Sequence, residues 1–178
     1  MRSAAAGAAL LLATAGVARA DDLGRAALSM GAAQLYNGPS DLEPTGLHVG
    51  VEAALHLGFV GPMLSLDVDR FGGAQASVPP TWLVAMGAGL RGFLVRARWP
   101  VALFLDAQGV VAGTTNPLAA IQPCSALARC GSSFLGGAAG AGLEWPGPIT
   151  IALGARYLYL ADGPQLVTFS LVVGFGAP

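Results

Sequence analysis

Apolar side chains recur at every second position along most of the chain. Between Leu47 and Leu57 the odd positions are Leu, Val or Ala, and the even positions are mainly His, Gly and Glu. A period of two places successive side chains on opposite faces of a β-strand. The rhythm returns in further segments and predicts eight strands, at 24–35, 47–58, 62–71, 82–95, 99–111, 134–145, 149–160 and 165–175.

Three of these segments, 24–35, 82–95 and 134–145, are rich in Ala and could by composition form helices. The last two also contain several Gly residues, and each Gly in a helix interior costs about 1 kcal/mol relative to Ala. We therefore expect strands in all three.

The connections between the predicted strands alternate in length. Residues 59–61, 96–98 and 146–148 form short joins, whereas 36–46, 72–81 and 112–133 are long, and only the last join on that side, 161–164, is brief. Short turns at one rim and long loops at the other are typical of outer-membrane barrels. The pattern predicts an all-β protein, an eight-stranded antiparallel up-and-down transmembrane β-barrel.

The first twenty residues have a different character. Arg2 is followed by an apolar run from Ala4 to Val17 and by Ala18-Arg19-Ala20. This order predicts a cleavable secretory signal peptide at 1–20 and a barrel domain at 21–178. About 14 apolar residues at ~1.5 Å each are too short for a helix to cross the ~30 Å hydrocarbon core of a bilayer.

Composition narrows the class further. Charged residues make up 11% of the 178 residues, 26 are Gly, Lys is absent, and the formal net charge is −1. A water-facing surface normally carries about 25% charged residues, so an ordinary soluble domain is excluded. The chain also lacks the basic patch that a nucleic-acid partner would require.

Alternation alone does not separate a membrane barrel from a soluble one, because the two differ only in which face points outward. The weaker face is mostly Gly and Ala, which would make a poor surface in water but suits the narrow interior of eight strands. We therefore expect the Leu, Val and Ile face to contact lipid. Aromatic residues near the strand ends predict two interfacial girdles. They are Tyr36, Phe71, Trp82, Trp99, Trp145, Tyr157 and Tyr159.

In these features the chain resembles the small eight-stranded outer-membrane barrels of Gram-negative bacteria, the OmpX-like and OmpW-like proteins and the OmpA barrel. The resemblance implies a location in the cell outer membrane, contact with its lipid, and a last strand read by the barrel-assembly machinery. The corresponding alternating residues here are Phe169, Leu171, Val173 and Phe175. In that class the strand commonly ends in an aromatic residue, whereas Gly176-Ala177-Pro178 follow Phe175 here.

Five charged residues fall on inward positions at middle depth. Because an isolated buried ion is costly, we expect them to pair and form a polar plug, with a proton or small-solute path as the alternative. They are Glu52, Asp67, Arg91, Asp106 and Arg156. Eight strands leave no wide aqueous channel.

Catalytic, metal and cofactor sites have little support in the sequence. His48 and His56 lie on one strand about 27 Å apart at ~3.4 Å per residue, too far to share a metal. Barrel enzymes such as lipid A deacylases would need His, Ser and an acid together near the outer rim. Ser40, Asp41 and Glu43 adjoin His48 but form no recognisable motif, so we expect no catalysis and no cofactor.

These observations predict a monomeric outer-membrane barrel with a structural, adhesive or surface-interaction role, in which loop 112–133 meets any extracellular partner. One alternative is a barrel enzyme or transporter acting on lipid or a small apolar solute. A second alternative is a soluble secreted barrel that binds a lipid inside.

Cys124 and Cys130 are the only cysteines, and both lie in the longest loop. In an oxidising exported compartment they should form a disulfide. The intact mass of the exported protein after alkylation without reductant should therefore show no added label. Two alkylated thiols would contradict the bridge.

Overall fold

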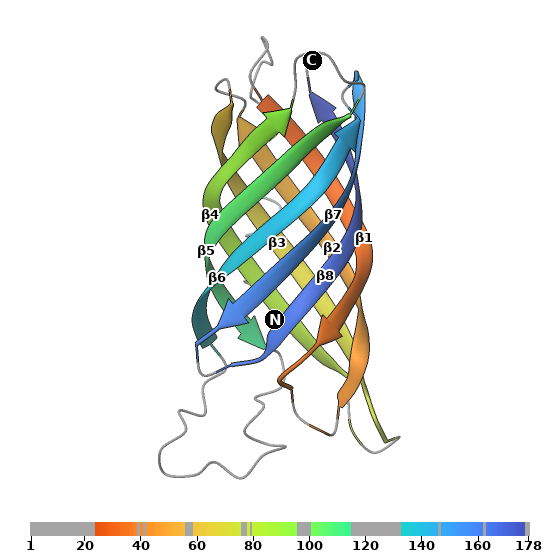
Figure 1. Cartoon of the computed structure of the whole chain (residues 1–178). Coiled ribbons are helices and arrows are strands. Elements are labelled where there is room, and N and C mark those ends of the chain that lie inside the picture. The colour runs from red at the N-terminus through yellow and green to blue at the C-terminus, as the bar shows by residue number, and fades with distance from the viewer. Residues whose placement is uncertain are drawn as a thin grey trace, which may run out of the picture.

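The computed structural model describes residues 24–38, 40, 42–55, 59–75, 78, 80–95, 101–114, 133–145, 147–161 and 163–176. Its strands are β1 (Gly24–Leu35), β2 (Leu42–Leu55), β3 (Val60–Gly73), β4 (Thr81–Val95), β5 (Ala102–Thr114), β6 (Ser133–Trp145), β7 (Ile149–Leu160) and β8 (Gln165–Gly176). Each strand pairs antiparallel with its neighbours in sequence, and β1 also pairs with β8, which closes the barrel (Figure 1). The predicted all-β, eight-stranded antiparallel barrel is confirmed. Among the described residues, no helix is long and apolar enough to cross a membrane.

The two ends of the barrel differ in the connections they carry. The odd-numbered strands finish at the lower end in Figure 1, which we call the long-loop end, where the joins are 36–41, 74–80, 115–132 and 161–164. The even-numbered strands finish at the opposite, short-turn end, where the joins are 56–59, 96–101 and 146–148. The longest join, 115–132, lies at the long-loop end as predicted, but 36–41 and 96–101 are both six residues long and 161–164 is brief, so the contrast between the two ends is weaker than the sequence predicted.

Strands β1 and β7 have their predicted bounds, and the other six differ by one to five residues, most of all β2 and β5. β2 begins at Leu42, five residues before the expected start, and its pairing with β3 shifts register between Leu42 and Gly46. Pro44 lies within that irregularity, where a residue without an N–H donor is tolerated. β5 begins at Ala102 instead of residue 99, after Pro100, which also has no backbone donor.

The predicted assignment of faces is confirmed. On β1, Leu28 is 56% exposed whereas the next residue, Ser29, is 7% exposed. Leu, Val, Ile and Phe side chains cover the outer wall, and the charged side chains on the same strands, except Glu43 and Arg70, point inward. This is the reverse of a soluble barrel.

The interior is filled in three levels. An apolar cluster that includes Phe71, Leu83, Phe134 and Leu166 occupies the long-loop half. A smaller apolar cluster that includes Phe104 fills the short-turn half. Most buried charged side chains lie between the two and form a polar level, whereas Arg25 and Glu144 lie near the strand ends beside the smaller cluster, where Glu144 is the register partner of Ala102 and Ala152.

The seam between β1 and β8 is tight. A Cβ added to Gly31 would overlap the Phe169 carbonyl and lie 2.8 Å from the Cα of Ser170, so only Gly fits there without a shift of the backbone.

Candidate functional site

Glu52 is the centre of the polar level. It comes from β2, and Arg91 of β4 holds it in a two-pronged arrangement, with Nη1 donating to Oε1 at 2.7 Å and Nη2 donating to Oε2 at 2.9 Å. Arg25 of β1 donates to Oε1 at 3.1 Å, and Arg156 of β7 lies 3.6 Å from Oε2. Four strands therefore meet at one carboxylate, and parallel donors of this kind form the strongest ion pairs.

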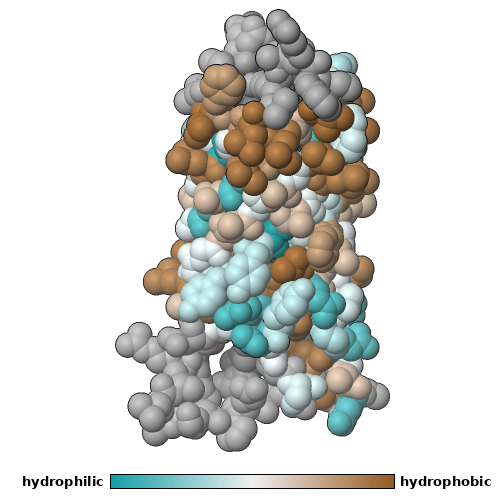
Figure 2. Space-filling view, in the orientation of Figure 1, coloured by the Kyte–Doolittle hydropathy of each residue, from teal (hydrophilic) through white to brown (hydrophobic). Residues whose placement is uncertain are grey.

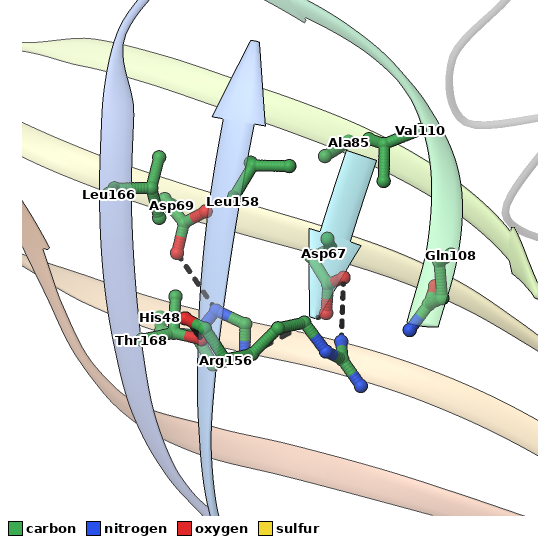
Figure 3. Close-up of a pocket in the computed structure, with 11 residues that line it drawn as sticks. His48, Asp67, Asp69, Ala85, Gln108, Val110, Arg156, Leu158, Leu166 and Thr168 are labelled. Atoms are coloured by element: carbon green, nitrogen blue, oxygen red, sulfur yellow. Dashed lines mark hydrogen bonds and ion pairs between the residues drawn. The ribbon is translucent and has the colours of Figure 1, made fainter. Parts of the chain in front are cut away.

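Two further carboxylates extend the network. Arg91 Nη2 donates to Asp106 Oδ2 at 3.2 Å, and Arg156 Nη1 donates to Asp67 Oδ2, also at 3.2 Å (Figure 3). The structure thus brings all five of the sequence-predicted inward charges into contact. Arg91 also lies over the Phe104 ring, 4.4 Å from its centroid, which joins the network to the apolar cluster of the short-turn half.

Arg25 and Glu144 belong to the same network, although the sequence prediction did not include them. Arg25 Nη1 forms an ion pair with Glu144 across the barrel, and both residues are buried. They fall on the inward set of alternating positions. Extending the period of two to the strand ends would have identified them.

A second chain of hydrogen bonds runs through His48. Its Nδ1 lies 2.8 Å from Asp69 Oδ1 (Figure 3). Its Nε2 lies 3.2 Å from Ser29 Oγ. Ser, His and Asp connected in this order have the connectivity of a serine-hydrolase triad. The partners of His48 are thus lumen residues of β1 and β3, a grouping that the sequence analysis did not identify.

The surroundings of this triad do not suit a substrate. His48 is 3% exposed and Asp69 1% exposed. Two cavities touch His48, with volumes of about 10 and 20 Å³, and each is large enough for roughly one water molecule. The triad can order water and polar groups, but no acyl chain fits beside Ser29.

Metal binding finds no site in the described part of the barrel, where no group of three or more His, Cys, Asp or Glu side chains could hold an ion. His56, Cys124 and Cys130 lie outside the described residues. The signal peptide at 1–20 also lies outside them and stays a prediction, as does the disulfide.

Most of the aromatic residues predicted for the girdles face outward. Five of those predicted for the girdles lie on the outer surface. They are Tyr36, Trp82, Trp145, Tyr157 and Tyr159. The prediction that Phe71 belongs to a girdle is wrong, because its side chain is 2% exposed and packs in the apolar cluster of the long-loop half. It follows the outward Arg70 and so points inward by the same alternation. Trp99 lies outside the described residues.

The last strand presents its predicted residues on the outer wall. Phe169, Leu171 and Phe175 are exposed there, and Val173 is partly exposed between them. Recognition of this strand by an assembly machinery remains a prediction.

Comparison with solved structures supports the fold. Neisserial surface protein A is 15% identical, with 87% of this chain and 96% of that chain covered at a TM-score of 0.60. Ail, the attachment invasion locus protein of Yersinia pestis, is 20% identical over 85% and 97% at a TM-score of 0.51. The outer membrane enzyme PagL is 10% identical over 86% and 99% at 0.53. No protein-family model and no curated protein matches the chain. The chain therefore has the fold of the small eight-stranded outer-membrane barrels.

Replacing Glu52 with Gln should destabilise the barrel strongly. The change removes the charge that three arginines share and leaves them buried without full compensation, which typically costs about 3–5 kcal/mol. Urea unfolding of the detergent-folded protein, followed by Trp fluorescence, measures the loss. Glu43→Gln is the matched control, since Glu43 is exposed. Equal midpoints for the two variants would contradict a structural role for the network.

Ser29 should not react with a fluorophosphonate, because no cavity beside it admits the reagent. Intact mass after incubation of the folded protein with this reagent tests the expectation, and Ser29→Ala identifies the reacting residue. A stoichiometric adduct that disappears in Ser29→Ala would instead establish an accessible, activated serine.

Proposed function

We propose that this protein is an integral outer-membrane β-barrel with a closed lumen and a structural or surface-interaction role, its long-loop end facing outward from the cell. The observation that carries the proposal is the inverted barrel, with an apolar outer wall around a core of ion-paired side chains. Exposure of this apolar wall to water would be unfavourable, whereas contact with the hydrocarbon of a bilayer is favourable.

The interior supports a closed lumen. Apolar clusters fill the two halves of the barrel, and the two cavities that touch His48 are water-sized. A larger hollow of about 210 Å³ is lined mainly by apolar residues of the outer wall, such as Leu28, Leu64 and Phe175, and also touches Glu52. An eight-stranded barrel is just wide enough for its own side chains. General permeation therefore has no path, and interactions fall to the loops and the outer wall.

The proposed surface role depends on the connections at the long-loop end. The join 115–132 is the longest, at the end opposite the short turns. It lies within the predicted loop 112–133, which we propose as the contact for an extracellular partner. Neisserial surface protein A and Ail share the fold, and their names describe a surface protein and an attachment invasion protein.

Expression in a Gram-negative host, followed by fractionation, should recover the protein in the outer membrane. It should migrate differently on gels before and after boiling, because a folded barrel resists detergent until it is heated. In planar bilayers it should give no steady conductance. Recovery as a freely soluble periplasmic protein would contradict insertion, and stable ion conductance would contradict the closed lumen.

Lipid A from cells with and without the protein separates the enzyme alternative from the structural role. Identical mass spectra are expected, because the cavities beside Ser29 and His48 have no room for an acyl chain. A lost or added acyl group would show catalysis.

A further inference from the structure

The outer wall is chemically different at its two ends. At the short-turn end its described outward residues are apolar, apart from the indole N–H of Trp145. Examples are Leu55, Val60, Leu94 and Ile149. The long-loop end instead carries a ring of hydrogen-bonding groups, which we call the polar rim. It consists of Gln34, Tyr36, Thr45, Arg70, Trp82, Tyr157, Tyr159 and Gln165. Figure 2 shows brown residues concentrated in the upper half of the molecule and teal and pale residues in the lower half.

Arg70 is the one cation on the outer wall of the described strands. The ion pairs among the described residues all lie inside the barrel. Glu43 is the other outward charge and lies toward the loop, close to Gly72. The exposed Arg70 guanidinium has no carboxylate partner in this part of the chain.

Trp82 positions this cation. The two residues are direct register partners on β3 and β4, and the guanidinium carbon of Arg70 is 5.7 Å from the centroid of the Trp82 ring. This cation–π interaction limits the freedom of a side chain that otherwise loses much entropy when it binds. None of the ion pairs among the described residues uses the Arg70 guanidinium, so its N–H donors can meet a ligand.

The neighbouring wall combines polar and apolar groups. Leu47, the register partner of Arg70 on β2, is exposed and offers apolar contact. Two residues before Leu47 on β2, nearer the long-loop end, Thr45 donates a hydrogen bond to Gln34 at 2.8 Å. Arg70 is three residues from the end of β3 at Gly73, roughly 7 Å below the rim for a strand tilted by about 45°. Arg70 lies beside the exposed Trp82, and Trp is enriched where headgroups meet acyl chains.

We propose that Arg70, held against Trp82, binds the anionic phosphate of a membrane-lipid headgroup in the leaflet at the long-loop end. The guanidinium fork matches the geometry of a phosphate. Leu47 contacts the acyl chains of the same lipid, and the Thr45 and Gln34 pair faces its polar groups. A lipid can form an ion pair with Arg70 and apolar contacts with the wall beside it, whereas a soluble anion can form only the ion pair. The proposal rests on the proposed insertion in a membrane.

A single-tryptophan protein tests this directly. Trp99→Phe with Trp145→Phe leaves Trp82 as the only reporter, and the folded protein is placed in phosphatidylcholine nanodiscs, whose own phosphates are neutralised by choline. Increasing fractions of diphosphoryl lipid A should shift Trp82 emission to saturation. Dephosphorylated lipid A should leave the emission unchanged.

Two variants of this protein give the decisive comparison. Arg70→Gln should raise the half-saturating lipid fraction about tenfold, the effect of losing one charge-assisted interaction. Glu43→Gln, which removes the other outward charge, should bind at least as well as the parent. Equal binding by Arg70→Gln would overturn the proposal.

A titration with inorganic phosphate alone distinguishes binding of a lipid headgroup from binding of a free anion. It should produce no comparable shift, and an equal response would show an anion site without lipid selectivity, which overturns the lipid assignment. Failure of the protein to enter nanodiscs as a heat-modifiable barrel would defeat the proposed function itself. Entry without discrimination between the two forms of lipid A defeats only this inference.

Discussion

Closure of β1 onto β8 is the constraint on which the rest of the molecule depends. With eight strands, the enclosed space is only as wide as the side chains that project into it. Every inward residue must therefore be small, packed or paired. Gly31 meets this demand at the seam, and Glu52 meets it at the centre by pairing with arginines from three other strands.

The same constraint decides what the lumen can do. Ser29, His48 and Asp69 have the order of a hydrolase triad, but the space around them holds water and little else. Side-chain chemistry alone is thus a poor guide to activity inside a narrow barrel, since access is set by the number of strands. Access to the outer wall is not limited by the number of strands. Its polar long-loop end and apolar short-turn end offer different groups to the molecules around the barrel.

Much of the fold could be predicted because a strand period of two is visible without knowledge of partners. The same period fixes which residues face inward, so Asp67, Arg91 and Asp106 could be placed in one lumen from sequence alone. Partner choice could not be predicted, because Arg25 meets Glu144 from a position 119 residues away. Phe71 was wrongly predicted to face outward. The prediction relied on its position near a strand end and did not apply the period of two, which places Phe71 on the face opposite Arg70. The start of β2 was missed because Pro44 and Gly46 have the composition of a loop.

The reach of the ion pairs has a consequence for how the chain enters a bilayer. Arg91 and Asp106 are register partners on adjacent strands, but Asp67 and Arg156 are 89 residues apart, and Arg25 and Glu144 are further still. A sheet that crossed hairpin by hairpin would carry Glu144 and Arg156 into hydrocarbon before their partners surrounded them, at a heavy cost in free energy. For a barrel inserted in a bilayer as proposed above, these ion pairs favour translocation together with curling of the sheet, so that the charges are shielded until the last strand meets the first.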